Sequence, residues 1–360
     1  MNITKLVPAC KSIIWGGNRL KERYGKNTEL SPLAETWELS FHKDGQCTLP
    51  DGRPLSEVAG EAELGKNCLG FDFFPVLVKF IDAQDRLSVQ VHPSDAYALA
   101  NENSLGKTEM WYIVDADEGA GIYLGFKENI TKDEFKAAIE NKTLTDHLRF
   151  IPVKRGESYF IPSGTIHAIC SGCLICEIQQ NSNITYRVYD YGRRDKDGNE
   201  RELHVAKALD VTSTSAIDPQ PLDIPVADGL LKGISRFFTA TLVEVSGDRS
   251  LADDNASFRC LSCLEGEGSI GGIQVRPGDS IFIPAGERAV ALSGSFKALM
   301  TTIRKYYYTT ESSDGILIGR ISNDLGEVII SGCAAQDSSA SDLKDGLLKR
   351  CGLSESDLEN

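Results

Sequence analysis

The chain has 360 residues, of which 41% are hydrophobic and 25% charged, a composition typical of a soluble globular protein long enough for two domains. Its formal net charge of −14 argues against a general nucleic-acid or anionic-membrane surface, so neither partner is expected. An anionic substrate would need a local basic pocket within this negative field.

The N-terminal stretch MNITKLVPACKSIIWGG has too short an apolar run and the wrong flanks for a signal peptide. No stretch approaches the roughly 20 apolar residues of a membrane span. Ten cysteines without an export signal favour reduced thiols, so a cytoplasmic location is expected.

The cysteine spacing admits two interpretations. Cys170, Cys173 and Cys176 form C-x2-C-x2-C, and Cys260 with Cys263 forms C-x2-C, spacings found in zinc and iron–sulfur sites. Small thiols inside buried strands would produce the same pattern. The surrounding residues lack the loop pattern of a zinc ribbon, which favours buried thiols.

Short extended runs dominate the first part of the chain. Residues 35–42 form one such run, and residues 73–93 read as two strands broken around residues 82–85. A further strand is expected at 108–115. Many short strands separated by turns indicate an antiparallel sandwich or barrel.

The clearest helical signal covers residues 130–148. Thr131 is the expected N-cap, and Glu134, three residues on, completes a capping box. Phe135 and Ile139 supply part of an apolar face. A helical insertion is therefore expected between the strands.

A proline-rich stretch, residues 216–229, separates the two halves of the chain and is interpreted as a linker. Strand patterns return from about residue 230 to 305. Beyond them, GILIGRIS and EVIISG suit a hairpin, and the last 22 residues, SASDLKDGLLKRCGLSESDLEN, suit a polar helix or a frayed tail.

One motif occurs twice, as GESYFIPSGTIH at 156–167 and GDSIFIPAGERA at 278–289. In each copy a glycine suits a turn with positive φ, and a proline stops the short strand that follows. The first copy ends in His167 and the second in Ala289. A duplicated unit that retains its histidine once suggests a working half and a structural half.

Polar residues alternate on the strands near the first copy. Gln90 and His92 share a strand face with Ser88, and Glu109 shares one with Lys107. Inside one small barrel a four-ligand cluster of mixed nitrogen and oxygen donors would form, and it suits zinc first, with Mn, Co or Fe behind. Its members are Gln90, His92, Glu109 and His167. The alternative for each residue is an ordinary hydrogen-bonded polar group in the core.

The remaining polar candidates carry less information. His42 is ambiguous, while His147 and His204 lie at expected helices and suit the surface or packing. The pair Arg193-Arg194 suits either a solvated loop or a phosphate clamp.

The pattern G-x5-P-x-G-x2-H resembles the second motif of the cupin superfamily, small antiparallel β-barrels that often hold a metal. Gln90-x-His92, and the sixteen residues between His92 and Glu109, depart from the general cupin pattern. They resemble type I mannose-6-phosphate isomerase, the zinc-dependent phosphomannose isomerase family, in its short bacterial branch. The resemblance covers roughly residues 8–305, from WGG through ETWELS, FIDAQDRLSVQVHP, GKTEMWYI and PSGTIHAI to EIQQNSNITYRVYDYGR.

This resemblance implies a mainly β fold of two cupin-like antiparallel β-barrel (jelly-roll) domains with a small helical insertion. Residues 1–215 would form the catalytic, metal-binding domain, with the insertion at about 130–148. Residues 230–311 would form a degenerate cupin-like domain without metal. Residues 312–360 would be a C-terminal extension of unknown role.

The implied activity is an aldose–ketose isomerase of mannose metabolism, which interconverts mannose 6-phosphate and fructose 6-phosphate through a cis-enediol(ate). The implied cofactor is one zinc ion per chain, with Gln90, His92, Glu109 and His167 as ligands. The only partner implied is the small sugar phosphate, and a monomer or weak dimer is expected.

The resemblance also implies roles for residues of the substrate cleft. Arg187 matches the family's active-site arginine and is expected to stabilise the enediolate. Glu177 and Lys107 are candidates for proton transfer, and the sequence does not choose between them. Ser88 and Lys107 are expected to bind substrate.

Other functions remain open on the sequence. Another sugar-phosphate isomerase would use the same residues, and an iron dioxygenase would normally present three histidines and a glutamate or an open His/carboxylate triad. Gln90 suits redox-inert chemistry better. A non-catalytic sugar-binding cupin is not expected to retain Lys107, Glu177 and Arg187.

Overall fold

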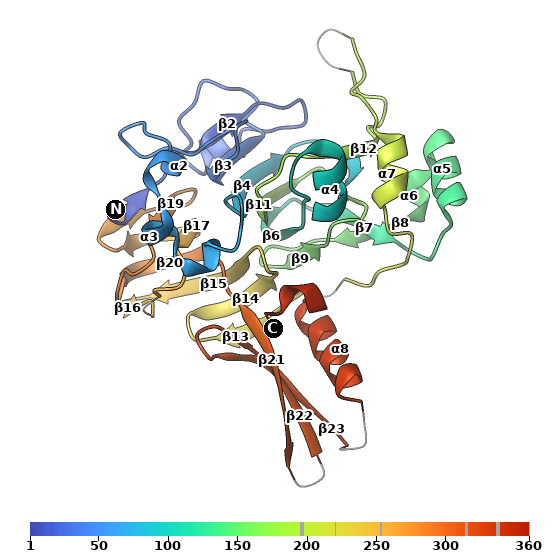
Figure 1. Ribbon diagram of the computed structural model, residues 1–360. Helices are drawn as coiled ribbons and strands as arrows, with labels where there is room; N and C mark the ends of the chain where they lie inside the picture. Colours follow the sequence, from blue (N-terminus) through green and yellow to red (C-terminus); the bar gives the residue numbers. More distant parts are fainter. Residues whose placement is uncertain (195–197, 220, 253, 314–315, 336–338, 360) are drawn as a thin grey trace. The chain divides into compact units, whose positions relative to one another are not determined.

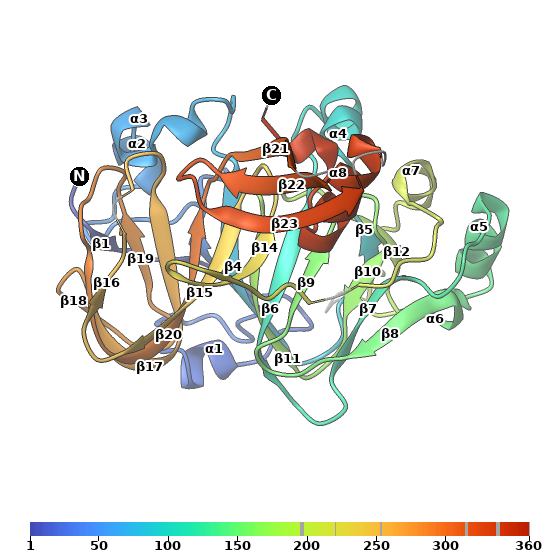
Figure 2. The same cartoon turned by 90° about the horizontal axis from the view of Figure 1, so that it is seen from below.

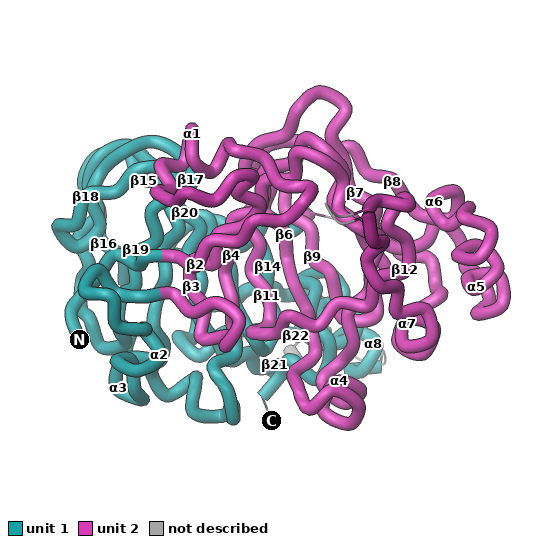
Figure 3. The backbone as a smooth tube through the Cα atoms, turned by 90° about the horizontal axis from the view of Figure 1, so that it is seen from above, with its two compact units in different colours: residues 1–7, 48–75, 222–360 teal, residues 8–47, 76–221 magenta. Residues whose placement is uncertain are grey.

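The structure is a computed structural model of residues 1–360, which describes every residue except 195–197, 220, 253, 314–315, 336–338 and 360. The chain divides into two compact units (Figure 3). Unit 1 comprises residues 1–7, 48–75 and 222–360, and unit 2 comprises residues 8–47 and 76–221.

The division after Pro221 falls inside the predicted linker 216–229. The N-terminal segments differ from expectation, because residues 1–7 and 48–75 belong to unit 1 rather than to the domain predicted for residues 1–215. The reason is a pairing between segments far apart in sequence, in which Thr4 and Lys5 lie opposite Phe282 and Ile281.

Unit 2 consists of antiparallel strands in two sheets (Figure 1). One sheet has the order β2 (Ala9–Lys11), β3 (Glu35–Leu39), β4 (Val76–Ala83), β11 (Cys173–Gln180), β6 (Glu109–Ala116), β9 (Ser158–Ile161). The other has the order β12 (Tyr186–Tyr189), β5 (Val89–Val91), β10 (His167–Ile169), β7 (Gly121–Phe126), β8 (Leu148–Pro152). A core lies between the sheets, since Ile81 and Trp111 from the first pack with Leu124 and Ile169 from the second.

Short helices complete unit 2, namely α1 (Arg19–Glu22), α4 (Asp95–Glu102), α5 (Lys132–Glu140), α6 (Leu144–His147) and α7 (Val205–Val211). The capping box is confirmed, because the Glu134 amide donates to Thr131 Oγ1 at 3.2 Å and the Thr131 amide donates to Glu134 Oε2 at 2.7 Å. The single helix expected at 130–148 is instead two helices, since Lys142 between them adopts a positive φ of 59° that α-helix does not allow.

Unit 1 contains a nine-stranded antiparallel sheet, seen in Figure 2. Its order is β1 (Thr4–Lys5), β19 (Ser280–Ile283), β17 (Arg259–Ile270), β20 (Ala291–Thr302), β15 (Thr239–Ser246), β14 (Gly229–Ile234), β13 (Ile224–Val226), with β16 (Arg249–Ser250) paired to β20 and β18 (Ile273–Val275) paired to β17. The segment 48–75 adds α2 (Leu55–Val58), α3 (Glu61–Leu64) and the 3₁₀ turn η1 (Lys66–Cys68).

The C-terminal extension folds as part of unit 1. Strands β21 (Tyr306–Ser313), β22 (Ile316–Asn323) and β23 (Val328–Ala335) form a small antiparallel sheet, followed by α8 (Ala340–Cys351) and η2 (Glu355–Asp357). The expected hairpin is the β22–β23 pair, and α8 lies along it (Figure 1). Leu231 and Ile234 of β14 share one core with Ile321 and Leu347, so this segment packs on the second domain.

The cysteines fit the buried-thiol interpretation. Cys173 and Cys176 are fully buried in β11 and, three residues apart, lie on opposite faces of the strand. Within the described residues the cysteines are thiols rather than disulfides, and none belongs to a metal-type cluster. No helix in the described part of the chain is long and apolar enough to cross a membrane.

Candidate active site

Three buried side chains converge between the two sheets of unit 2. His92 follows β5, Glu109 begins β6 and His167 begins β10. The Nε2 atom of His92 lies 3.5 Å from Glu109 Oε2, and Nε2 of His167 lies 3.3 Å from Glu109 Oε1. All three side chains are at most 1% exposed, so the cluster is buried.

Both imidazoles direct an unprotonated Nε2 into this cluster. The Nδ1–H of His92 donates to the carbonyl of Ile184, and that of His167 donates to the carbonyl of Thr165, each at 2.8 Å. Burial lowers the pKa of His92 to about 3 and lowers the pKa of His167 as well, so both rings are neutral. A neutral Nε2 beside a carboxylate is what a divalent cation requires, so these residues fit a metal ion.

Gln90 joins the same cluster. It pairs with His167 across β5 and β10, and its amide nitrogen lies 3.3 Å from His167 Nε2. Its amide oxygen faces Ser88 Oγ at 3.4 Å, and a half-turn of the amide would exchange the two atoms. The structure therefore brings together the four residues that the sequence suggested as ligands.

Lys107 occupies the centre of this group. Its ammonium forms an ion pair with Glu109 Oε2 and lies 3.0 Å from His92 Nε2. It also lies 3.7 Å from Glu177 Oε1. A divalent cation held by Glu109 would repel this ammonium, so the two charges compete for one carboxylate.

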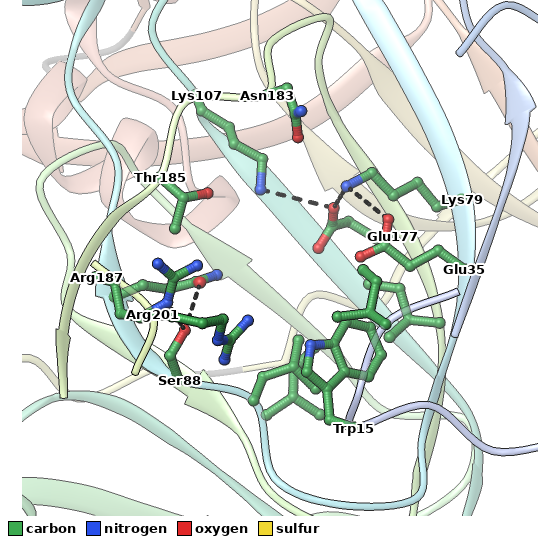
Figure 4. A pocket seen from close by; sticks show the side chains of 15 residues that line it. Trp15, Glu35, Lys79, Ser88, Lys107, Glu177, Asn183, Thr185, Arg187 and Arg201 are labelled. Atoms are coloured by element: carbon green, nitrogen blue, oxygen red, sulfur yellow. Dashed lines mark hydrogen bonds and ion pairs between the residues drawn. The ribbon is translucent and has the colours of Figure 1, made fainter. Parts of the chain in front are cut away.

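A cavity of about 310 Å³ adjoins the cluster, a size suited to a small metabolite (Figure 4). The predicted cleft residues Ser88, Lys107, Glu177 and Arg187 line it, and so does the predicted ligand Gln90. The sequence analysis missed other lining residues, among them Trp15, Glu35, Lys79, Asn183, Thr185 and Arg201.

At one end of the cavity a carboxylate lies between two lysines (Figure 4). Glu177 on β11 pairs in register with Lys79 on β4 and Trp111 on β6. The Lys79 ammonium lies 3.2 Å from Glu177 Oε1, and the Trp111 indole N–H donates to Glu177 Oε2 at 2.9 Å. The second lysine, Lys107, approaches the same Oε1.

Lys79 also faces Glu35, at 3.7 Å. Burial alone would lower the pKa of Lys79, but the carboxylates of Glu177 and Glu35 outweigh it and hold that pKa above its ordinary value. Lys79 therefore stays charged and stabilises the Glu177 carboxylate. One sequence signal pointed to it, because Lys79 and Asp82 interrupt an otherwise apolar strand, where buried charges are normally paired or functional.

At the other end of the cavity two arginines are held by neighbours (Figure 4). Arg187 donates from Nε to Ser88 Oγ at 3.2 Å and from Nη1 to the carbonyl of Glu202 at 2.9 Å. Arg201 makes a two-pronged pair with the buried carboxylate of Asp190, at 2.7 and 2.6 Å. Each guanidinium thus has a fixed orientation with donor capacity to spare.

The other polar candidates are placed elsewhere. His204 caps α7 and supports Arg187, since its backbone N–H donates to the Arg187 carbonyl at 2.7 Å. His147 ends α6, and the His42 ring packs against Trp37. The exposed Arg194 pairs with Glu200.

Comparison with known proteins agrees with this geometry. The family model for the catalytic domain of type I phosphomannose isomerase matches residues 3–119, and that for the mannose-6-phosphate isomerase cupin domain matches residues 232–303. The mannose-6-phosphate isomerase of Streptococcus mutans is 38% identical over 283 residues, which cover 75% of this chain and 89% of that protein. The chain belongs to the mannose-6-phosphate isomerase family.

Further relatives support this membership. A probable mannose-6-phosphate isomerase of Bacillus subtilis, GmuF, is 38% identical over 294 residues, or 78% of this chain and 92% of that protein. The crystal structure of a Bacillus subtilis mannose 6-phosphate isomerase superposes with a TM-score of 0.78 at 33% identity, covering 84% of this chain and 99% of that one. The chain is thus an isomerase, and the expected mainly β, cupin-like fold is confirmed.

The second copy of the motif shows what replaces the cluster in this isomerase. Glu109 lies opposite Ile161 just before the first motif's proline, and Arg259 lies opposite Ile283 just before the second's. Arg259 therefore occupies the position equivalent to Glu109.

A second match extends this equivalence. The Gly164 N–H donates to the carbonyl of His92, and the Gly286 N–H donates to that of Asp254, so Asp254 is equivalent to His92. The two histidines of the first copy's cluster, His92 and His167, are thus replaced by Asp254 and Ala289. At the position of the negatively charged Glu109 in the first copy, the second copy carries the positively charged Arg259.

We predict that Arg259→Met destabilises the enzyme by about 2–4 kcal/mol. The buried guanidinium donates to the carbonyls of Ala252 and Glu287 at 2.6 and 3.0 Å, and both would lose a partner where water does not reach. Urea unfolding measures the change. Arg249→Met is the matched control, since Arg249 also donates to two carbonyls but is 31% exposed, and it should cost clearly less. An equal loss of unfolding free energy in the two variants would contradict the role of Arg259 as a buried donor to these two carbonyls.

Proposed function

We propose that this isomerase interconverts mannose 6-phosphate and fructose 6-phosphate through a cis-enediolate in the cavity of unit 2. One observation carries the proposal. A cluster of neutral imidazoles and a carboxylate adjoins the cavity, which is lined by Glu177 between two lysines and by a separate pair of oriented arginines. A sugar phosphate needs these three functions, which are carbonyl polarisation, proton transfer and anion recognition.

Gln90, His92, Glu109 and His167 would hold one divalent ion per chain, zinc first, because the donor set is borderline in hardness. When bound there, such an ion supplies a Lewis acid that polarises hydroxyl and carbonyl oxygens. The orientation of both histidines, fixed by the carbonyls of Ile184 and Thr165, supports this assignment.

Glu177 is the proposed base. In the aldose-to-ketose direction it takes the proton from C2 as the C1 carbonyl becomes an enediolate oxygen, and it returns that proton to C1. The hydroxyl proton on O2 moves to O1 as the C2 carbonyl forms, and Lys107 is the candidate group for this transfer. Arg187 stabilises the negative charge on the enediolate oxygens. Ser88 holds the Arg187 guanidinium and, with Lys107, binds the substrate hydroxyls.

Arg201 is the proposed contact for the phosphate. The Asp190 carboxylate accepts hydrogen bonds from Nε and Nη2 of Arg201, which leaves Nη1 to bind a ligand. Burial would raise the pKa of Asp190, but Arg201 and Arg193 lower that pKa below its ordinary value. The Asp190 carboxylate that orients Arg201 therefore stays ionised at neutral pH. This is the local basic pocket that a protein of net charge −14 needs for an anionic substrate.

Arg201→Gln should raise KM for mannose 6-phosphate about 10- to 100-fold with little change in kcat, the effect of losing a charge-assisted hydrogen bond that the reacting atoms do not share. Steady-state kinetics measure it. Arg194→Gln makes the same charge change at a side chain 61% exposed and should leave KM within about twofold. A similar rise in both variants would show that only net charge matters.

The activity is tested with a coupled assay on mannose 6-phosphate, with and without a chelator, together with metal analysis of protein purified without chelator. We expect turnover that the chelator removes and added zinc restores, with about one zinc per chain. Turnover unaffected by chelation, or protein without metal, would refute the metal site. No turnover of mannose 6-phosphate would refute the substrate and direct the search to other sugar phosphates.

We further propose a cytoplasmic enzyme, monomeric or weakly dimeric, without nucleic-acid or membrane partners. The charge of −14 and the ten cysteines support it. Light scattering across a concentration series tests the oligomeric state.

A further inference from the structure

The apolar wall of the cavity includes Trp15, which precedes α1 in a short loop (Figure 4). Trp15 is 4% exposed and packs in one core with Ile81 and Leu87. It belongs to no strand or helix, and its carbonyl accepts one backbone hydrogen bond, from Asp85 at 2.9 Å. The position of this wall therefore depends on how its loop is anchored.

The anchor is a buried carboxylate at the end of β4. Asp82 is fully buried, and it accepts the Arg19 backbone N–H at Oδ2 (2.8 Å) and the Arg19 Nε–H at Oδ1 (2.6 Å). The loop backbone passes so close that a Cβ on Gly17 would lie 2.4 Å from Asp82 Oδ2. Glycine is required there, and an ionised Asp82 is tolerated only because its charge is paired.

Arg19 joins this loop to a third segment. Its Nη1 donates to the carbonyl of Gly172 at 3.2 Å and its Nη2 to that of Cys173 at 2.8 Å, in the turn that enters β11. Strand β11 carries Glu177. One guanidinium thus connects the loop of Trp15, the end of β4 and the start of the strand with the proposed base.

We propose that Arg19 and Asp82 are positioning residues that hold Trp15 as the apolar wall of the substrate cavity, an inference that rests on the function proposed above. Neither residue lines the cavity, so both act through Trp15. A loosened wall weakens binding of substrate and transition state alike, which raises KM and leaves kcat nearly unchanged.

The test compares Arg19→Gln with Arg23→Gln. Arg23 adjoins the same helix, but its side chain is 60% exposed and pairs with Asp115 at 3.0 Å, so the control repeats the charge change without the buried bonds. We expect Arg19→Gln to raise KM for mannose 6-phosphate about tenfold, with kcat within about threefold and metal content unchanged. Arg23→Gln should match the wild type.

A double-mutant cycle separates positioning from general destabilisation. If Arg19 acts through Trp15, the effect of Arg19→Gln on KM should disappear in a Trp15→Ala background, whereas independent effects would multiply. If Arg19→Gln does not fold, Arg19→Lys is the alternative variant. It retains the positive charge beside Asp82 but loses the paired hydrogen bonds to the carbonyls of Gly172 and Cys173, and it should show a smaller rise in KM.

Amide hydrogen exchange gives a readout that needs no substrate. Residues 13–19 should exchange faster in Arg19→Gln, and not in Arg23→Gln, even if the wild type fails to turn over mannose 6-phosphate; that result would support the anchor and refute the proposed substrate. Unchanged exchange in this loop, an unchanged KM, or a KM effect that persists without Trp15 would overturn the proposal.

Discussion

Replacing His167 with alanine should remove metal and activity together. The side chain is fully buried, and its Nε2 faces Glu109 with a tautomer fixed by the Thr165 carbonyl, so no other group can take its place. We expect kcat/KM to fall by at least about 10³-fold, beyond the roughly 10–100-fold that loss of a partner behind a ligand causes. Metal analysis and the coupled assay on the same preparation measure both effects.

The control for this variant is His147→Ala, the same substitution on α6 at a residue outside the cluster. It should retain metal and turnover. Retention of stoichiometric zinc in His167→Ala would contradict the ligand assignment. Loss of activity with metal retained would instead make His167 a residue that acts on substrate.

Glu177→Gln should retain the metal and lose turnover. The amide preserves the shape of the side chain and an acceptor for the Trp111 indole N–H, but it cannot take a proton from C2. Loss of a positioned base reduces kcat by about 10²–10⁴-fold, and KM should change little because Arg187 and Arg201 remain. Exchange of deuterium from C2 of labelled substrate into solvent should be lost in parallel.

Glu35→Gln is the matched control. Glu35 lies 3.7 Å from the same Lys79 and lines the same cavity, so its amide makes an equal change of charge beside that lysine. A much smaller effect than that of Glu177→Gln assigns the proton transfer to Glu177. Equal losses would show that both act through Lys79, and near-normal turnover in Glu177→Gln would leave Lys107 as the base.

Much of the candidate site was predictable because strand periodicity is local. The two-residue repeat of a strand puts Gln90 and His92 on one face, and the repeated motif marks where His167 enters. The resemblance to a known family then joined them with Glu109. The structure brings these four side chains together as expected.

The missed residues depend on contacts between distant segments. Lys79 reaches Glu177 because β4 and β11 pair in a register that no local pattern records. Arg201 is oriented by Asp190, 11 residues earlier in the chain, a pairing that no local pattern records. The N-terminal strand was assigned to the wrong half for the same reason, since its partner is β19.

The sequence alone determined three features: the duplicated motif, the alternation of polar residues and the capping box at Thr131. Each is a pattern among residues that are close neighbours in the chain. Only the tertiary structure decided that Arg259 replaces Glu109 in the second copy, that the C-terminal strands complete unit 1, and that Arg19 anchors the wall of the cavity. Those features follow from register and burial between segments up to 154 residues apart, as between Arg19 and Cys173. The free energy that selects them exists only in the packed chain.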